Sequence, residues 1–455
     1  MHRVRAYIEA NQERFLAELS AVLRFPSMDG NAEGLAGAAR WTADRLAALN
    51  AQPRMLSAGD HPPAVYGEVG AGERVLLSYT HYDVQPADPL EQWESPPFDP
   101  VVRDGKLYAR GVADDKGDTM ARIHAVEAYR AVYGGDLPLR MRFFVEGEEE
   151  TGSTHLTPLA ERFSDLLRAD GALWEGGGYD ASDRYTFYCG LKGIAYVELR
   201  AHGAGHDLHS AYAPMAPNPA WRLVQALGTL KDAHDRITLD GFMDHVRPPS
   251  EADLSFIRRI PFSGADLKAS WGVPAFINDM DDEAALIRFL TQPTCTICGL
   301  RSGFIEEGTK TVLPSAATAK VDFRLVPDLI PELVMDLLRA HLDRRGYHDV
   351  ESVLLNGMVG ARADTGSPVV RSAVEAAREV YAHEPVVYPS HGGSGPMHDL
   401  VQGVGTPGGV MAGVGYAGMR MHSPNENIRI VDYLRHIEFL VAFMGRFATT
   451  SREVT

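Results

Sequence analysis

The sequence predicts a layered α/β domain that is interrupted by a smaller, inserted α+β domain. Helical patterns alternate with short apolar strands over about the first 190 residues, which is typical of a layered α/β domain. The middle of the chain changes to two strand-and-helix units, and the first pattern resumes from Ser367. We therefore expect one domain formed by residues 1–191 and 362–455, with residues 192–361 inserted as a small sheet that has helices on one face.

Each element is predicted from the spacing of its apolar residues. In the first domain these are helix 1–19, helix 35–49, strand 74–80, helix 119–132, strand 141–145, helix 369–381 and helix 431–447. In the insert they are strand 194–200, a helix that begins at Asn218 and Pro219, strand 317–324, helix 333–338 and strand 350–355. A long irregular stretch, residues 237–309, separates the two units of the insert.

Composition and charge exclude several classes of function. The 455 residues carry a formal net charge of -17, and we find no cluster of Lys and Arg that could neutralise nucleic-acid phosphates. No apolar run is long enough to span a membrane, and the charged N-terminal segment lacks the apolar core of a secretion signal. The three cysteines include a CxxC pair, Cys295 and Cys298, whose spacing on a strand points the two thiols to opposite faces. We expect a cytoplasmic protein with no membrane and no nucleic-acid partner.

Acidic and histidine side chains follow several of the predicted strands. Loops after strands commonly carry site residues. The central stretch is residues 107–118, LYARGVADDKGD, in which two carboxylates stand between a short strand and a helix. An Asp-rich turn that caps a helix is the alternative for this pair alone, but the rest of the chain adds further candidates. The whole set is His81, Asp83, Asp114, Glu149, Glu150, Glu175 and His422.

This set contains the donors that a pair of divalent metals requires. Two imidazoles and several carboxylates form a mixed N and O ligand set, which suits zinc, with cobalt or manganese possible. One bridging carboxylate would let five side chains hold two metals. Glu149 and Glu150 are adjacent and project in different directions, so that one can bind metal while the other handles the proton of the attacking water.

The order and wording of these motifs resemble one known enzyme family. The strings THYDVQP, RGVADDKGD, EGEEETGS, DLHSA, GGSGP and MHSPNE follow one another over nearly the whole chain. They resemble the co-catalytic zinc metallopeptidases that include carnosine dipeptidase, succinyl-diaminopimelate desuccinylase, acetylornithine deacetylase and carboxypeptidase G. The DVQP and KTVLP strings are most similar to the dipeptidase branch. The resemblance implies a zinc-peptidase-type catalytic domain with a mixed central sheet flanked by helices, plus a ferredoxin-like α+β lid and dimerisation domain.

The resemblance also implies a ligand for each of two zinc ions. By this comparison His81 and Glu175 would hold one zinc, Glu150 and His422 the other, and Asp114 would bridge them. Asp170 and Asp180 are alternatives to Glu175, and the glutamate run allows a one-residue shift of register over 148–150.

The resemblance also implies roles for two residues beside the metal ligands and the conformation of one peptide bond. Asp83 would orient His81, and Glu149 would be the general base and acid. The peptide that follows the bridging aspartate is often cis in this family, so we expect a cis bond between Asp114 and Asp115.

Three residues of the insert and its neighbourhood would bind the substrate. His209 in DLHSA corresponds to a histidine that steadies the oxyanion from the partner subunit, which makes a homodimer the expected form, although Ala211 replaces the usual glycine. Arg324 and Ser394 resemble the residues that bind the substrate carboxylate, a task that suits the planar guanidinium.

We therefore expect a di-zinc hydrolase that cleaves the amide bond of dipeptides or short peptides with a free carboxylate. A metal-activated water would attack the carbonyl, with Glu149 as general base. The alternative within the hydrolases is a deacylase of N-acyl amino acids, such as acetyl or succinyl derivatives. The alternative outside them is a non-catalytic relative that binds peptides.

Overall fold

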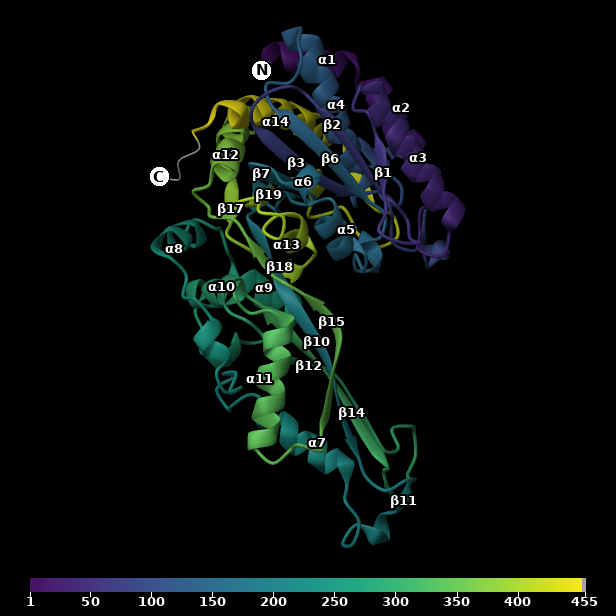
Figure 1. The fold of residues 1–455 in the computed structure, drawn as a ribbon, viewed down its shortest axis with the longest axis vertical. Helices are drawn as coiled ribbons and strands as arrows, with labels where there is room; N and C mark the ends of the chain where they lie inside the picture. Colours follow the sequence, from purple (N-terminus) through teal and green to yellow (C-terminus); the bar gives the residue numbers. More distant parts are fainter. Residues whose placement is uncertain (452–455) are drawn as a thin grey trace. The chain divides into compact units, whose positions relative to one another are not determined.

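Two compact units make up the chain, and each has its own sheet. The computed structural model describes residues 1–451. The first unit comprises Met1–Gly190, Arg362–Pro389 and the chain from Pro396 onward, and the second comprises Leu191–Ala361 with Ser390–Gly395. Helices accompany the sheet in each unit, which confirms the predicted α/β class (Figure 1).

The sheet of the first unit has both parallel and antiparallel neighbours. Its strand order is β1-β2-β6-β3-β7-β19-β9-β8-β20, and β17 pairs with β9. These strands are β1 (Arg54–Leu56), β2 (Ala64–Val69), β3 (Val75–His81), β6 (Arg140–Glu146), β7 (Gly171–Trp174), β8 (Gly178–Tyr179), β9 (Tyr185–Tyr188), β17 (Val386–Tyr388), β19 (Gly409–Met411) and β20 (Gly415–Tyr416). Strand β3 runs parallel to both β6 and β7. The carboxyl ends of these three strands therefore meet at one edge of the sheet.

A second, small sheet links two distant parts of the first unit. Its order is β21-β5-β4, formed by β4 (Val101–Arg103), β5 (Lys106–Tyr108) and β21 (Asn427–Arg429). Asn427 of β21 is opposite Tyr108 of β5 in the antiparallel register. This pairing brings the chain that follows His422 beside the chain that leads to Asp114.

Helices pack against the main sheet and against one another. Helix α3 packs on β2, α4 packs on β3 and α14, and α12 packs on β19 and α14 (Figure 1). The helices of this unit are α1 (His2–Ala10), α2 (Gln12–Leu23), α3 (Ala32–Ala48), α4 (Lys116–Tyr133), α5 (Leu156–Arg162), α6 (Ser164–Leu167), α12 (Pro368–Val380), α13 (Met397–Leu400) and α14 (Ile430–Thr449), with short 3-10 turns η1 (Leu90–Gln92) and η2 (Glu149–Thr151). The predicted helices and strands of this unit are present, apart from one correction.

The predicted first helix is wrong as a single element. Residues 1–19 divide into α1 and α2 at Asn11, whose backbone leaves the helical conformation. The side-chain amide of Asn11 donates to the carbonyl oxygen of Tyr7 at 2.8 Å. Asparagine competes in this way with the helical hydrogen bonds, while the apolar pattern continues unbroken across the junction. The spacing of apolar residues could therefore not reveal the break.

The second unit is built on a long central strand. Strand β10 pairs antiparallel with β14 on one side and β15 on the other, in the order β12-β14-β10-β15, and β16 and β18 also pair with β10. The strands are β10 (Gly190–His202), β12 (Thr296–Ser302), β14 (Ala316–Leu325), β15 (Glu351–Met358), β16 (Ala361–Arg362) and β18 (His391–Ser394), and a separate pair is formed by β11 (Leu208–His209) and β13 (Val312–Leu313).

One face of this sheet is buried under helices. Val197 and Leu199 of β10 lie in one buried cluster with Leu223 of α7 and with Val334 and Leu338 of α11. The helices and 3-10 turns are α7 (Pro219–Leu227), α8 (Glu251–Ile257), α9 (Gly264–Trp271), α10 (Asp282–Thr291), α11 (Pro331–Arg344), η3 (Ser210–Tyr212), η4 (Phe242–His245) and η5 (Ile277–Asp279). Alternate residues of β10 and β14 face this core, as the alternating pattern predicts.

The expectation of an irregular stretch over 237–309 is wrong. This stretch contains helices α8, α9 and α10 and the whole of the edge strand β12. Each helix begins at a side-chain cap, which is Ser250 for α8, Ser263 for α9 and Asp281 for α10. The helices are only 7, 8 and 10 residues long, which is too short for a clear apolar period.

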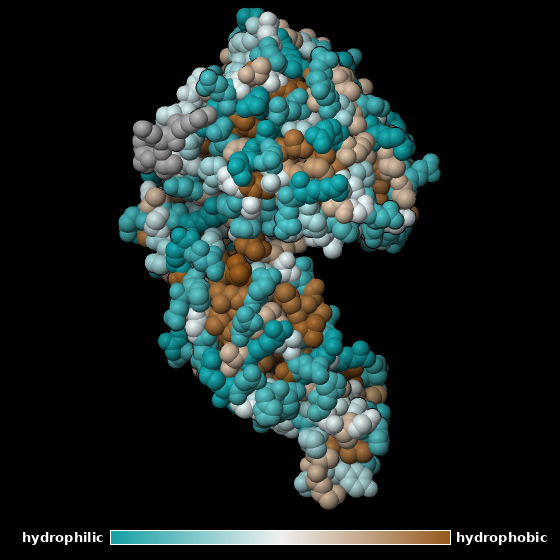
Figure 2. Space-filling view, viewed as in Figure 1, coloured by the Kyte–Doolittle hydropathy of each residue, from teal (hydrophilic) through white to brown (hydrophobic). Residues whose placement is uncertain are grey.

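Several large apolar side chains of the second unit reach solvent. Figure 2 shows hydrophobic residues on the surface of this part of the chain. Trp221 of α7 is 65% exposed, and Ile297 and Leu300 of β12 are 52% and 55% exposed. β12 stands at an edge of its sheet. Exposed apolar patches on edges commonly mark interaction surfaces.

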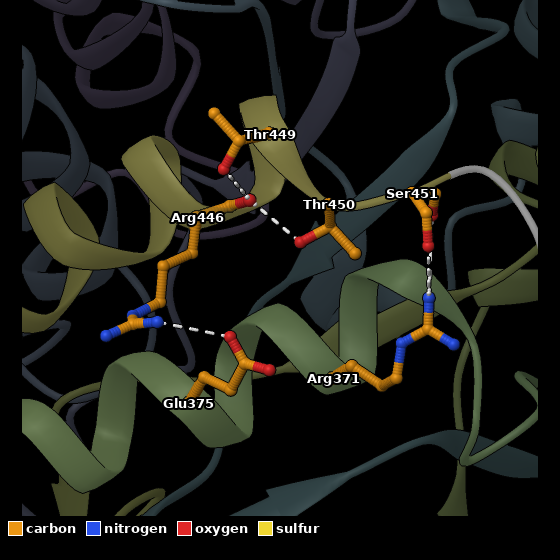
Figure 3. Close-up of a pocket in the computed structure, with 6 residues that line it drawn as sticks. All are labelled: Arg371, Glu375, Arg446, Thr449, Thr450 and Ser451. Carbon is orange, nitrogen blue, oxygen red and sulfur yellow. Dashed lines mark hydrogen bonds and ion pairs between the residues drawn. The ribbon is translucent and has the colours of Figure 1, made fainter.

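The ends of α12 and α14 enclose a surface pocket that holds none of the predicted site residues. It is lined by Arg371 and Glu375 of α12 and by Arg446, Thr449, Thr450 and Ser451 at the end of α14 (Figure 3). Arg446 forms ion pairs with Glu375 at 3.1 Å and with Glu379 at 2.9 Å. These ion pairs hold the last helix against α12. We therefore interpret the pocket as a result of helix packing and not as a binding site.

Two expectations from composition are met in the described residues. None of the helices in residues 1–451 is both long enough and apolar enough to cross a bilayer. None of Cys189, Cys295 and Cys298 forms a disulfide in the described residues. Cys295 is buried while Cys298 is exposed, as predicted for two thiols that point to opposite faces.

We predict that His436 makes the first unit less stable at acidic pH. Its Nδ1 donates to the hydroxyl of Tyr185 (3.0 Å), which itself donates to the carbonyl of Gly413, and its Nε2 is buried without a hydrogen-bond partner in the described residues. Burial, with the nearby charge of Arg122, lowers the pKa of His436 to about 3. The unfolded chain binds this proton near pH 6.5 but the folded chain does not, so stability falls as pH decreases below 6.5.

The expected contribution is about 1.4 kcal/mol per pH unit between pH 6.5 and 3. Urea unfolding of the metal-free protein at pH 7.5 and pH 5 measures it, with His436→Phe as the matched variant that removes the titrating group. An equal loss of stability in the two proteins between these pH values would contradict the assignment.

Candidate metal centre

The edge where β3, β6 and β7 end gathers the predicted site residues. His81 is the last residue of β3, Glu149 and Glu150 follow β6, and Glu175 directly follows β7. His81 is fully buried, and its Nδ1 donates to the backbone carbonyl of Asp83 at 3.0 Å. Its Nε2 therefore faces the site, 3.0 Å from Asp114 Oδ1 and 3.5 Å from Glu175 Oε2.

Asp114 lies between the two predicted histidines. While its Oδ1 meets His81, its Oδ2 lies 2.8 Å from Nε2 of His422, and that Nε2 is also 3.3 Å from Glu150 Oε2. Burial raises the pKa of Asp114, but hydrogen bonds with His422 and His81 outweigh it and hold that pKa well below its usual range. The peptide between Asp114 and Asp115 is cis, as expected.

The adjacent glutamates have different surroundings. Both carboxylate oxygens of Glu150 are held by Gln85, through its backbone N–H at 3.1 Å and its side-chain amide at 2.9 Å. The backbone N–H of Glu150 donates to Asp83 Oδ2 at 2.9 Å. Burial raises the pKa of Glu149 to about 7, with the charges of Asp114 and Glu150 adding to the rise and His81 opposing it. A carboxyl with such a pKa can exchange protons near neutral pH.

Two groups of side chains at this edge have metal-binding spacing. Potential ligand atoms of His81, Asp115 and Glu175 lie within 4.8 Å of one another, and so do those of Asp114, Glu150 and His422. Asp114 is also close to the first group, because its Oδ1 lies beside His81 Nε2. We therefore favour Asp114 over Asp115 as the carboxylate common to both groups. Asp115 Oδ2 already accepts the backbone N–H of His81 at 3.2 Å, which gives that carboxylate a structural role.

The alternatives to Glu175 lie elsewhere. Asp170 Oδ2 accepts the backbone N–H of Val75, at the opposite end of β3 from His81. Asp180 accepts hydrogen bonds from Ser182 and Arg184 within its own turn. Neither joins the cluster, whereas Glu175 lies in it with only 13% of its side chain exposed.

The charge balance of the cluster fits divalent cations. Burial raises the pKa of Glu175 well above its usual range, and its Oε2 has no hydrogen-bond partner in the described residues. Hydrogen bonds to Asp114 and Glu150 raise the pKa of His422 to about 10. Burial lowers the pKa of His81, but Glu175, Asp114 and Asp83 outweigh burial and raise it well above its usual range. The carboxylates thus attract positive charge to both imidazole Nε2 atoms, where a metal can replace the proton.

A buried glutamate that sequence reasoning missed holds the Asp114 loop in place. Glu426 is 0% exposed, and its Oε1 accepts the backbone N–H groups of Ala113 (2.8 Å) and Asp114 (3.2 Å). Its Oε2 accepts from the guanidinium of Arg110 (2.7 Å) and from the N–H of Gly111 (3.0 Å). Gly111 has a φ of 83°, which other residues rarely adopt. Glu426 belongs to the quoted MHSPNE string, but only the fold reveals its partners.

The remaining predicted residues belong to the second unit. Arg324 donates to the hydroxyl of Ser394 at 3.0 Å and to Asp322 Oδ2 at 3.1 Å, and Ser394 donates to the carbonyl of Gly193 at 2.9 Å. Arg324 and Ser394 are thus brought together. His209 is exposed in β11, its Nδ1 accepts the N–H of Ala211 at 3.1 Å, and its Nε2 lies 3.5 Å from the hydroxyl of Thr311.

Comparison with known proteins identifies the family. The model of peptidase family M20/M25/M40 matches residues 77–446. This match covers most of the chain, so the chain belongs to this family of metallopeptidases.

Individual relatives cover nearly the whole chain. Beta-Ala-His dipeptidase of Homo sapiens is 28% identical over 417 residues, which are 89% of this chain and 82% of the relative. Cys-Gly metallodipeptidase DUG1 of Saccharomyces cerevisiae is 27% identical over 404 residues, which are 85% of this chain and 82% of the relative. The structure of the metallo-carboxypeptidase Sso-CP2 from Sulfolobus solfataricus has 34% identity and a TM-score of 0.87, covering 95% of this chain and 99% of that one.

We predict that Glu426→Gln weakens metal binding by about 10- to 100-fold. The amide directs an N–H donor toward Arg110 or toward the backbone N–H groups of the loop, which are donors themselves. The Asp114 loop is then no longer held in place. Glu438→Gln is the matched control, since it removes a buried carboxylate that pairs with Arg5 at 3.1 Å. Competition with a zinc-binding dye measures the affinity. Equal zinc affinities in the two variants would mean that Glu426 stabilises the fold but does not position the metal ligands.

Proposed function

We propose that this chain hydrolyses the amide bond of dipeptides or short peptides that carry a free carboxylate. The observation that carries the proposal is the position of Asp114 between His81 and His422, with the carboxylate of Glu149 in the same cluster. The named dipeptidases among the relatives support the substrate class.

Two zinc ions per chain are the proposed cofactors, with cobalt or manganese as substitutes. His81 and Glu175 would hold one ion, Glu150 and His422 would hold the other, and Asp114 would contribute to both. When bound, the metals supply Lewis acidity, which activates a water and polarises the substrate carbonyl. Asp83 keeps the proton of His81 on Nδ1, because its carbonyl can only accept a hydrogen bond there.

Glu149 moves the proton in this proposal. Its carboxylate takes a proton from the attacking water and delivers it to the leaving amine. In the metal-free chain, burial and the charges of Asp114 and Glu150 raise its pKa to about 7, toward the pH range in which a general base exchanges protons. Glu150 is held by Gln85 and therefore serves as a ligand rather than as a base.

Substrate binding is assigned to Arg324, Ser394 and His209. The guanidinium of Arg324, fixed by Asp322, binds the substrate carboxylate together with the Ser394 hydroxyl. His209 of the partner subunit donates from Nε2 to the oxyanion that forms during attack.

The proposed assembly is a homodimer in which residues 192–361 form a lid and dimerisation domain inserted between residues 1–191 and 362–455. Exposed Trp221 on α7 and exposed Ile297 and Leu300 on the edge strand β12 support a contact surface on this domain. A cytoplasmic location is also proposed, because cysteines that form no disulfide in the described residues suit a reducing compartment.

We expect the zinc-loaded enzyme to cleave dipeptides such as Beta-Ala-His or Cys-Gly at least about 100-fold more efficiently than N-acetyl or N-succinyl amino acids, since the site is proposed to accept an aminoacyl group. Chelation should abolish cleavage, and zinc should restore it. A panel of dipeptides, longer peptides and N-acyl amino acids, each compared by kcat/KM, makes the measurement.

The panel separates the alternatives. Faster cleavage of N-acyl amino acids would make the chain a deacylase. Faster release of C-terminal residues from longer peptides would favour a carboxypeptidase, as in the Sulfolobus relative. No cleavage of any substrate with two metals bound would indicate a non-catalytic relative.

Glu149→Ala should lower kcat by about 100-fold or more while zinc content stays unchanged, because the proton-transfer group is lost but no ligand is. Glu148→Ala is the neighbouring control and tests the register of the glutamate run. The assignment of the base is refuted if Glu149→Ala keeps most of its activity and Glu148→Ala loses it.

His209→Ala should be inactive, dimeric and loaded with zinc. In an equal mixture with Glu149→Ala subunits that exchange freely, about one site in four combines an intact Glu149 with an intact partner histidine, so activity should return to about a quarter of that of the wild type. Mixed dimers without activity would contradict the role of His209 across the subunit boundary.

A further inference from the structure

A third cluster of histidine and glutamate side chains lies outside the proposed centre. It consists of His61 in the loop between β1 and β2, Glu148 after β6, and His155 directly before α5. The Nδ1 atom of His155 is 2.9 Å from Glu148 Oε2, and the Nδ1 atom of His61 is 3.5 Å from the same oxygen. The two imidazole rings are stacked, with centroids 4.3 Å apart and planes 5° from parallel. One ring nitrogen of each histidine thus lies near the same carboxylate oxygen, and one of the two stacked rings must rotate before both nitrogens can bind a single ion.

This arrangement has the donors and spacing of a transition-metal site. Two neutral imidazoles and one carboxylate make an N₂O set that zinc accepts, with a fourth position left for water. Tetrahedral zinc ligands with bonds of about 2.0 Å are about 3.3 Å apart, and the observed separations of 2.9 and 3.5 Å bracket this value. The His61 side chain is 1% exposed, whereas that of His155 is 43% exposed, which opens the fourth position to solvent.

The hydrogen bonds of the metal-free cluster show what binding must displace. The backbone N–H of Ala58 donates to His61 Nε2 at 3.1 Å, so the proton of this ring is on Nδ1, 3.0 Å from the carbonyl of Pro62. The Nδ1 of His155 donates to Glu148. Zinc binding through Nδ1 requires the proton of each neutral ring to move to Nε2, and it turns the Ala58 amide away from His61. This cost makes the site weaker than the centre around Asp114.

Binding here would join three separate segments. The backbone carbonyl of Glu148 accepts the N–H groups of Thr151 (3.2 Å) and Ser153 (2.8 Å), which closes the turn that carries Glu149. We propose that His61, Glu148 and His155 form an additional zinc site that ties this turn to the loop around His61 and to the start of α5.

Zinc binding to the wild type and to His155→Gln tests the proposal. Both proteins, already saturated at their tight sites, are dialysed against increasing free zinc, and bound metal is counted by mass spectrometry. The wild type should bind one zinc per chain more than the variant, or bind it at least about tenfold more tightly. His348→Gln, which changes an exposed histidine of the second unit, should behave as the wild type.

The outcomes are separable from those of the proposed function. Zinc that every protein retains at low free zinc is bound at the centre around Asp114. Failure of that centre to bind zinc is therefore detected separately from failure of the additional site. His61→Gln should lose the same zinc, and His155→Gln carries the test if the buried His61 variant does not fold. Equal zinc numbers and affinities in the wild type and in His155→Gln would overturn the proposal.

Discussion

The buried ion pair between Glu426 and Arg110 is the interaction on which the candidate centre depends. The Glu426 carboxylate also accepts three backbone N–H groups of the 111–114 loop, so one side chain fixes most of the loop that presents Asp114. Glu426 lies four residues after His422, and β21 pairs with β5 directly beyond it. The Glu426 carboxylate thereby joins the two segments that carry Asp114 and His422. Removing one partner of such a pair leaves the other as an uncompensated buried charge, which costs about 3–5 kcal/mol.

The parallel pairing of β3, β6 and β7 supplies the other half of the centre. It delivers His81, the Glu149–Glu150 turn and Glu175 to one edge of the sheet. Burial and the repulsion between neighbouring carboxylates at this edge raise the pKa values of Glu149 and Glu175. Divalent cations relieve it, because each replaces an imidazole proton and neutralises more than one carboxylate. The same charge pattern that destabilises the metal-free edge thus gives it affinity for metal.

Much of this arrangement could be predicted from the sequence, because its elements have clear periods and its ligands follow strands. His81, Asp114, Glu150, Glu175 and His422 were expected as a set, and they lie in one cluster. The partners that orient them could not be predicted, since Gln85 and Glu426 meet their targets only through tertiary contacts across 65 and more than 300 residues. The helices of 237–309 were missed because each is shorter than three turns.

The proposed chemistry requires that Asp114 is shared by two metal ions. Anomalous X-ray diffraction at the zinc absorption edge, from crystals of the zinc-loaded protein, tests it most directly. Two anomalous peaks should flank the Asp114 carboxylate, one beside His81 and Glu175 and the other beside Glu150 and His422. A single peak at this edge of the sheet, or two peaks of which only one contacts Asp114, would contradict the shared ligand and the chemistry that depends on it.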